Sequence, residues 1–394
     1  LGENFASFLL LKNSLVENKQ IKELNLRYNS LGNFPEAINL LKEILNKNKN
    51  KSSITNLFLG GNSLGEKKNK KSLLLLKDIL IENNSLKMLD LENNNFAENF
   101  ESMEILYWIF EENKNIFTLL IGENFFGKFE KSFRIFFAML IKKKFVKNLD
   151  FRYNELNYNL ETMNIFKELM IGEICFVENL NIFGNNLGNN FANFKIFCEI
   201  LASEKNEILK VLNFGGNLLS KNIEVMKLFG NSMKINRSII DLNLEGNDFG
   251  KNFEAVKILL DFLEFNPTLQ ILNLDNNELG SNLLIMKEFK LRLLNGNKIR
   301  KLSLNLNDLG DNEENLENLK DMILCNENTN SLKEIELRDN YIGYNIISMK
   351  ILRVLLQKNL SLNIINLGGN MLKEKYFSDI EDLGLRSDLI IIKK

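Results

Sequence analysis

Apolar residues along this chain follow two alternating spacings. Short segments of the form Leu-x-Leu place apolar side chains two residues apart, as in "LNL" at 24–26 and at 242–244. This spacing predicts a strand with one buried face. Between such segments, apolar residues recur every three or four positions, for example Phe253, Val256, Leu259 and Leu263. That stripe predicts the buried face of an amphipathic helix, so the chain is expected to alternate strands and helices.

A single phrase accounts for this alternation. It reads Leu-x-Leu-x-x-Asn-x-Leu-Gly, with Ile or Phe at some Leu positions, and it occurs twelve times between "LNLRYNSLG" at 24 and "INLGGNMLK" at 365. Its central residue is always asparagine, and successive copies are 30 to 33 residues apart. A fixed period of this size predicts a solenoid of stacked repeats. The twelve central asparagines are Asn29, Asn62, Asn94, Asn124, Asn154, Asn185, Asn217, Asn247, Asn277, Asn307, Asn340 and Asn370.

Asparagine is expected to have two structural roles in each repeat. The central asparagine should enter the core after the strand, where its amide can satisfy backbone groups of its own turn and of the neighbouring repeat. Stacking of repeats would then align these residues in an asparagine ladder. A second asparagine, such as Asn252, precedes the helical stripe and is a natural N-cap. Each repeat is therefore predicted to run strand, turn, helix, turn.

On these residues the chain resembles the leucine-rich-repeat proteins, specifically the ribonuclease-inhibitor-like class, over essentially all 394 residues. The resemblance implies an α/β fold: a right-handed leucine-rich-repeat solenoid, or horseshoe, with parallel strands on the concave face and helices on the convex face. We expect one solenoid over 1–394, with about twelve full repeats. The period is longer than the usual range for these repeats, and we attribute the excess to longer helix–strand loops.

The two ends of the chain fit the same register. "LGENF" at 1–5 corresponds to the second half of a repeat, so we expect its strand to precede residue 1. "LIII" at 389–392 is expected to be a short terminal strand with Leu389 and Ile391 buried.

Composition and charge exclude several classes of function. Fifty Lys and Arg residues nearly balance 51 Asp and Glu residues, so no global field recruits nucleic acid. The absence of histidine excludes catalysis or metal binding through imidazole. Cys175, Cys198 and Cys325 are far apart, which predicts buried thiols in a reducing compartment. We expect an intracellular location, in the cytoplasm or, as the alternative, in an organelle. No apolar run is long enough for a membrane span, and we expect no enzyme activity, cofactor or metal.

The side chains that alternate with the buried leucines should form one continuous concave surface. At these positions nine acidic residues occur against four basic ones, which disfavours nucleic acid there and favours a basic or polar protein segment. Asn181, Asn213, Asn243 and Asn273 are in register and can bind an extended chain, although an asparagine-rich composition also produces such rows. The residues predicted to bind a partner here are Arg27, Phe58, Asp90, Glu92, Asp150, Arg152, Asn181, Phe183, Asn213, Asn243, Glu245, Asn273, Asp275, Glu336 and Arg338.

Two further features fall outside the concave surface. Trp108 occupies a helix position at which other repeats have polar residues, so it should be exposed on the convex side and contact a partner. Basic stretches occur at 46–51, 66–71 and 142–144. We interpret them as solvated loops, with docking to an acidic partner or an RNA backbone as the alternative.

These observations favour a non-enzymatic recognition or scaffold module that binds a partner protein along its concave face, within a larger complex. The alternative is a regulator of a small GTPase, because Ran GTPase-activating proteins share this repeat class and have a comparable length. No arginine here matches a catalytic loop residue of those proteins, so none is assigned that role. A third interpretation is the sensor arm of a larger receptor.

Overall fold

The computed structural model describes residues 4–45, 52–142, 146–172, 176–293, 298–324, 331–372 and 388–393. The chain divides into two compact units, Leu1–Asn185 and Asn186–Lys394. The two units are described separately.

Unit 1 alternates three-residue strands with helices. Each strand pairs in parallel with the next one in the chain, and the first Leu of each phrase lies opposite its counterpart, as in Leu24 and Leu57. The strands are β1 (Glu23–Asn25), β2 (Asn56–Phe58), β3 (Met88–Asp90), β4 (Thr118–Leu120), β5 (Asn148–Asp150) and β6 (Asn179–Asn181). The helices are α1 (Phe5–Val16), α2 (Pro35–Leu45), α3 (Lys70–Glu82), α4 (Phe100–Glu112), α5 (Glu130–Lys142) and α6 (Leu160–Ile171).

Unit 2 repeats this arrangement, again with parallel pairing of successive strands. The strands are β7 (Val211–Asn213), β8 (Asp241–Asn243), β9 (Ile271–Asn273), β10 (Lys301–Ser303), β11 (Glu334–Glu336), β12 (Ile364–Asn366) and β13 (Ile390–Ile392). The helices are α7 (Phe191–Ala202), α8 (Ile223–Ile235), α9 (Phe253–Phe265), α10 (Leu283–Arg292), α11 (Glu313–Leu324) and α12 (Ile346–Lys358).

Most repeats add a short 3-10 turn between strand and helix, which the apolar pattern did not predict. The turns are η1 (Leu31–Asn33), η2 (Lys67–Asn69), η3 (Phe126–Lys128), η4 (Leu187–Asn189), η5 (Leu219–Lys221), η6 (Phe249–Lys251), η7 (Leu279–Ser281) and η8 (Leu309–Asp311).

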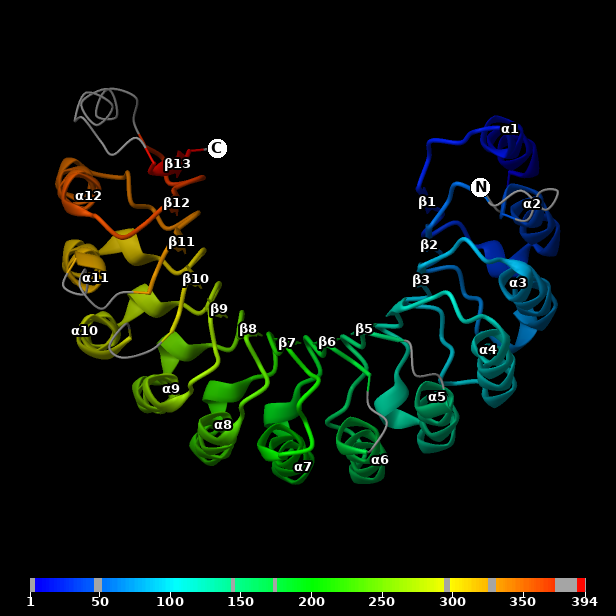
Figure 1. The fold of residues 1–394 in the computed structure, drawn as a ribbon, viewed down its shortest axis with the longest axis horizontal. Coiled ribbons are helices and arrows are strands. Elements are labelled where there is room, and N and C mark those ends of the chain that lie inside the picture. Colours follow the sequence, from blue (N-terminus) through cyan, green and yellow to red (C-terminus); the bar gives the residue numbers. More distant parts are fainter. Residues whose placement is uncertain are drawn as a thin grey trace. The chain divides into compact units, whose positions relative to one another are not determined.

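In each unit taken by itself, the strands line the inner side of the curve and the helices line the outer side (Figure 1). The core lies between these two layers. Both leucines of the phrase are buried, as Leu242 and Leu244 show, and so are helix residues such as Val256, Leu259 and Leu263. Since each repeat has too little apolar surface to fold alone, its stability comes from stacking on its neighbours. The predicted α/β leucine-rich-repeat fold is confirmed.

Asparagine begins the helices as predicted, but the first stripe position is not buried. Asn252 Oδ1 accepts a hydrogen bond from Ala255 N, 3.2 Å away. The residue that follows this cap, Phe253, is only half-buried, and its counterparts Phe100 and Phe191 are each 47% exposed. Side chains of a helix lean toward its N-terminus, so in the first turn they extend past the helix end instead of onto the strands.

The central asparagines form a hydrogen-bonded ladder within each unit. Asn247 Oδ1 accepts from the backbone N of Asn217 (3.1 Å) and of Leu219 (3.2 Å) in the preceding repeat. Its Nδ2 donates to the carbonyls of Phe214 (3.1 Å) and Leu244 (3.0 Å). Asn62, Asn94, Asn124, Asn277 and Asn307 make the same kinds of contact. Each of these asparagines therefore satisfies backbone groups of two repeats.

The backbone enters the left-handed region on both sides of the ladder asparagine. Asn307, for example, is flanked by Leu306 (φ 55°) and Asp308 (φ 56°). Among the described residues, 19 non-glycine residues and five glycines have positive φ, and all of them occupy these two positions. A non-glycine residue costs about 1–2 kcal/mol in this conformation. The contacts of the ladder must therefore offset this cost in every repeat.

Several smaller predictions have mixed outcomes. Leu389 and Ile391 are half-buried, although they were expected to be buried; among the described residues, Ile391 has sheet neighbours from β12 alone. Residues 66–71 are not a loop, since they form η2 and the start of α3. Cys198 is buried, and burial raises the pKa of its thiol to about 12. Cys175, Cys325, the stretch 46–51, and 143–144 of the stretch 142–144 lie outside the described residues.

Candidate partner-binding strand face

The last residue of most strands hydrogen-bonds to its own chain. Asn243 Oδ1 accepts from Glu245 N at 2.8 Å, and Asn273 Oδ1 accepts from Asp275 N at 2.7 Å. Asn25, Asp90, Asp150, Asn181, Asn213 and Asn366 use one side-chain oxygen in the same way. Such bonds divert the backbone out of the extended conformation. The asparagine row predicted to bind an extended chain therefore has a structural role as well, which leaves its Nδ2 groups for other contacts.

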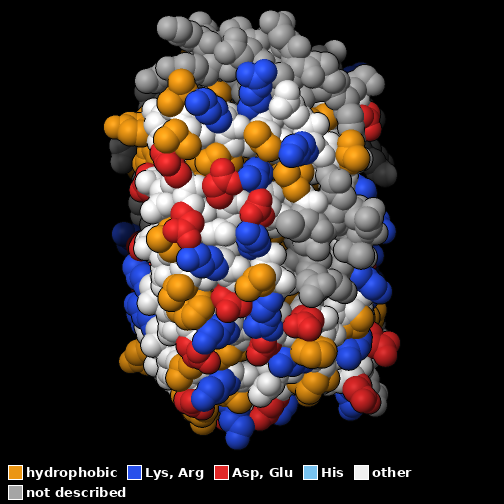
Figure 2. Space-filling model, turned by 90° about the vertical axis from the view of Figure 1, so that its left-hand side faces the viewer, with side chains coloured by type: hydrophobic (Ala, Val, Ile, Leu, Met, Phe, Trp, Pro, Cys, Tyr) orange, Lys and Arg blue, Asp and Glu red, His pale blue; other side chains and the backbone are white. Residues whose placement is uncertain are grey.

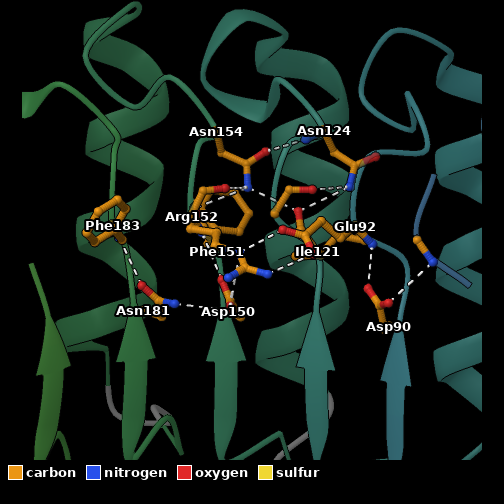
Figure 3. Close-up of polar contacts among 12 residues, drawn as sticks. Asp90, Glu92, Ile121, Asn124, Asp150, Phe151, Arg152, Asn154, Asn181 and Phe183 are labelled. Atoms are coloured by element: carbon orange, nitrogen blue, oxygen red, sulfur yellow. Dashed lines mark hydrogen bonds and ion pairs between the residues drawn. The ribbon is translucent and has the colours of Figure 1, made fainter. Parts of the chain in front are cut away.

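Glu92 is the centre of an ion-pair network on the strand face of unit 1 (Figure 3). Arg152 lies on one side, with Nε 2.6 Å from Glu92 Oε1 and Nη2 2.7 Å from Oε2. Arg27 lies on the other side, with Nη2 3.1 Å from Glu92 Oε2. Two-point contact of this kind fixes the orientation of the guanidinium group and also compensates its charge. We call these residues, together with Asp90, the arginine–glutamate network.

Two glycines make this network sterically possible. Arg27, Gly60, Glu92, Gly122 and Arg152 occupy the same position in five successive repeats, so each arginine must cross one intervening repeat to reach the glutamate. A Cβ on Gly122 would lie 2.8 Å from Arg152 Cγ and 3.0 Å from its carbonyl oxygen. Any larger residue there would displace the arginine.

Asp90 and Glu92 were predicted to face a partner, and this prediction is wrong. Asp90 is fully buried and Glu92 is 6% exposed. Asp90 Oδ2 lies 2.5 Å from Arg27 Nε and accepts from Gly60 N at 3.3 Å. The two arginine side chains cover these carboxylates because the glycines between them leave the space empty. The four charges compensate one another, so the network adds no net charge to the face.

The remaining predicted residues of unit 1 lie around this network. Phe58 stacks beneath Arg27, whose Cζ is 5.5 Å from the ring centroid. Asn181 Nδ2 donates to Asp150 Oδ2 at 3.0 Å. Burial raises the pKa of Asp150, although the positive charge of Arg152 acts in the opposite direction. Phe183 packs edge-on against Tyr153, with 5.5 Å between ring centroids.

Asp275 is a hydrogen-bond acceptor for the next repeat in unit 2. Its Oδ1 accepts from Ser303 Oγ (2.6 Å) and Asn305 N (2.7 Å), and its Oδ2 accepts from Asn305 Nδ2 (3.1 Å). Ser303 and Asn305 were not among the predicted site residues. Their hydroxyl and amide groups are common polar surface chemistry, and only the register of adjacent repeats brings them to Asp275.

A second group of charges lies on β10 to β12. Lys301 Nζ is 2.5 Å from Glu334 Oε1 and 3.6 Å from Glu336 Oε1. Glu336 also accepts from Asn366 Nδ2 at 2.6 Å. Arg338 has an exposed side chain. The side chain of Lys301 is therefore held over β11, the next strand along the chain.

The strand face of unit 2 has a hollow of about 450 Å³. Side chains from β7 to β11 line it, and most of them are polar. The lining includes the predicted residues Asn213, Asn243, Asn273 and Glu336, whereas Glu245 does not line it.

Trp108 is exposed, as the helix pattern predicted. Its side chain is 54% accessible, and its ring meets Tyr107 edge-on at 5.7 Å. On the helix side of unit 2, acidic and basic side chains are interspersed (Figure 2). Neighbouring helices pair there, as with Lys287 and Glu314 (2.8 Å) and with Lys290 and Asp321 (2.6 Å). Exposed pairs of this type contribute little to stability.

Neither a metal centre nor a membrane segment is found in the described ranges. These residues contain no group of three or more acidic or cysteine side chains that could hold a metal ion. No helix among them combines the length and apolar character needed to cross a bilayer.

Comparisons with known proteins find likeness among solved structures only. No family model matches the chain, and no curated protein matches it. Among solved structures, it is similar to the receptor chain in "Crystal structure of TLR13-ssRNA13 complex", with a TM-score of 0.46 and 15% sequence identity. The likeness covers 89% of this chain and 46% of the other, so the chain spans less than half the length of that structure.

Proposed function

We propose that the chain is a non-enzymatic recognition module of the ribonuclease-inhibitor-like class, and that a partner protein binds along its strand face. The class assignment is supported by the α-helix of 10–13 residues in each described repeat. One observation carries the function: four of the polar side chains that line the hollow on the strand face of unit 2 have a group that pairs with no residue the structure describes, namely Asp241 and the Nδ2 groups of Asn213, Asn243 and Asn273. Polar groups without a partner in the chain contribute no hydrogen bond to the stability of the fold, so they remain available to a ligand.

The two units offer different surfaces to a partner. In unit 1 the charges of the arginine–glutamate network satisfy one another, and what remains accessible is aromatic or amide surface such as Phe58 and Phe183. In unit 2 the predicted strand-face positions include five acids (Asp241, Glu245, Asp275, Glu334 and Glu336) and two bases (Lys301 and Arg338). This excess of acid favours a basic protein segment over nucleic acid.

Site-specific photocrosslinking tests this proposal. A photoreactive phenylalanine analogue placed at Glu245, on the strand face, should crosslink a protein partner in cells. The same analogue at Glu254, in the first turn of α9 on the helix side, is the matched control and should not crosslink that partner. Crosslinks only to RNA, or equal crosslinking from both positions, would contradict the proposal. Faster GTP hydrolysis by a small GTPase on addition of the chain would favour the regulator alternative.

A further inference from the structure

Three amide groups on unit 2 have no hydrogen-bond acceptor among the described residues. Asn213, Asn243 and Asn273 end β7, β8 and β9 and lie directly opposite one another in the parallel register. We call them the amide row. The Oδ1 of each accepts from the backbone two residues ahead. Within the part of the chain that the structure describes, none of the three Nδ2 groups donates to a protein atom, and all three side chains line the hollow.

Two corresponding amides elsewhere on the strand face are satisfied internally, whereas Asn25 at the end of β1, like the amide row, uses only its Oδ1 among the described residues. Asn181 Nδ2 donates to Asp150 on the preceding strand, and Asn366 Nδ2 donates to Glu336. In both cases an acidic residue occupies an adjacent repeat. The members of the amide row have each other as neighbours. On the next strand, β10, the residue opposite Asn273 is Ser303, which is not acidic. Their donors are therefore left for solvent or for a ligand.

Asp241 provides a second unsatisfied group at the same hollow. Its register neighbours are Val211 and Ile271, which are apolar. Its half-buried carboxylate makes no hydrogen bond or ion pair with any described residue, since Lys301 is held by Glu334 and Glu336. Burial raises the pKa of Asp241, with only the charge of Lys301 opposing it. A cation bound beside this carboxylate would replace the solvation that it has lost.

We propose that the hollow over β7, β8 and β9 binds an extended polypeptide segment that carries a lysine or arginine. Main-chain carbonyls of the segment accept hydrogen bonds from the amide row, and its cation pairs with Asp241. The inference rests on the proposed recognition function and specifies the chemistry of the partner at this site.

The dimensions define a short recognition element. Neighbouring strands lie about 4.8 Å apart, so the amide row spans roughly 10 Å, which is about three residues of an extended chain at about 3.3 Å each. The segment therefore runs across the strands, along the direction in which the repeats stack. Its basic side chain points toward the start of β8, where Asp241 lies. Asp241 is two residues before Asn243 and therefore on the same face of the sheet.

Selection from a random peptide library tests the occupant. Seven-residue peptides displayed on phage are panned against the full chain 1–394. We expect the enriched peptides to contain lysine or arginine, and we expect fluorescence polarisation to show that Asp241→Asn weakens their binding at least tenfold. Replacing the basic residue of the peptide by norleucine should give a loss of similar size in the wild-type protein and no further loss in Asp241→Asn.

A milder variant tests the amide row. Asn243→Ser should weaken binding about threefold to tenfold. Serine occupies the equivalent place in β10, so the fold accepts it, and its hydroxyl can still accept a bond from the turn. Glu254→Gln removes the same charge as Asp241→Asn but from the helix side, and should leave binding unchanged. Thermal melts establish that each variant is folded.

The outcomes separate this inference from the function on which it rests. Enriched peptides without a basic residue, or affinities unchanged by Asp241→Asn and Asn243→Ser, would overturn the inference and leave a recognition function located elsewhere on the chain. If no peptide is enriched, an extended polypeptide is not the occupant. If crosslinking from Glu245 also finds no protein, the recognition function fails as well. An oligonucleotide that binds the hollow in a manner sensitive to Asn243→Ser would likewise overturn the peptide assignment.

Discussion

Leu306 shows what the repeat demands of a single residue. Its φ of 55° lies in the left-handed region and its side chain is 50% exposed, so neither conformational preference nor burial favours leucine there. Asparagine adopts this conformation more readily than other non-glycine residues. The repeat geometry, imposed by the ladder asparagine next to it, decides the conformation.

Replacing Leu306 by asparagine should therefore stabilise the protein. We expect Leu306→Asn to raise the free energy of unfolding by about 0.5–1 kcal/mol, measured by urea denaturation, because the backbone strain falls and little buried surface is lost. Leu284→Asn is the control, since Leu284 is comparably exposed but lies in α10. The control should be neutral or destabilising, and a loss of stability in Leu306→Asn would contradict this account.

The ladder asparagines should be intolerant of replacement by a residue of similar size. Asn247→Leu would leave the backbone N–H groups of Asn217 and Leu219 and several carbonyls without partners in a buried region. We expect a loss of about 1–3 kcal/mol in the free energy of unfolding. Asn363→Leu, at an exposed position before β12, should change stability by less than about 0.5 kcal/mol. Equal effects of the two substitutions would show that the ladder bonds do not matter.

Asp241 should make a pH-dependent contribution of definite sign. Its pKa is raised in the folded chain by burial, so the folded state binds this proton more tightly than the unfolded state, whose Asp pKa is about 3.9. Stability is therefore lost as pH rises through the folded pKa. The stability of Asp241→Asn relative to the wild type should increase with pH above about 4 and then level off. Denaturation of both proteins between pH 3.5 and 7 measures this difference, and a decrease with pH would refute it.

At the scale of elements, the arginine–glutamate network joins five successive repeats. Each arginine is 60 to 65 residues away in sequence from the carboxylates with which it pairs. The glycines between them are as necessary as the charged residues. Removing the central carboxylate breaks the two-point contact of Arg152 and one of the two carboxylate contacts of Arg27, both partly buried, which is more costly than losing an exposed ion pair.

Glu92→Gln should therefore destabilise unit 1 by about 1–3 kcal/mol, a value reduced from that of a fully buried pair because both arginines are partly exposed. Urea denaturation provides the measurement. Glu224→Gln, which removes an exposed partner of Lys227, is the matched control and should cost less than about 0.5 kcal/mol. If Glu92→Gln were as mild as the control, the network would be only a surface feature.

The elements themselves were predictable from the sequence, whereas these contacts were not. Period-two and period-three-to-four spacing located the strands and helices because burial on one face is a local property of the chain. Asp90 and Glu92 were placed on the surface because strand alternation says which side of the sheet a residue is on. It does not say whether a side chain from another repeat covers that residue. The signal that could have shown this was the order Arg, Gly, Glu, Gly, Arg read across five repeats.

The left-handed positions were missed for a related reason. Only five of them are glycine, and the others include Tyr153 and Leu218, which do not indicate positive φ by residue type. At Asn243 the sequence predicted the strand-face position. It did not predict that the side-chain Oδ1 would accept a hydrogen bond from Glu245 N. The Nδ2 group that remains for a ligand could be recognised only from the hydrogen bonds.

At the scale of the whole molecule, the absence of histidine leaves few groups that titrate near neutral pH. The buried Cys198 thiol has its pKa raised to about 12 and stays protonated, and unperturbed carboxylates titrate well below pH 6.

We therefore expect the free energy of unfolding to change by less than about 0.5 kcal/mol between pH 6 and 7.5. Urea denaturation at several pH values in this range, at constant ionic strength, tests this. A single histidine introduced at a buried site, as in Phe214→His, provides the contrasting case and should produce a visible slope. A steep slope in the unmodified chain would reveal a strongly shifted group.

The ladder also has a direction, and this affects how the chain is made. From Asn62 onward, the Oδ1 of each ladder asparagine accepts from the turn of the preceding repeat, as Asn62 does from Asn29 N and Leu31 N and as Asn277 does from Asn247 N. A turn that has left the ribosome therefore lacks its hydrogen-bond acceptor until about 30 further residues have been synthesised. During translation the most recent repeat waits for its successor, so ordered structure follows the growing chain at a distance of one repeat.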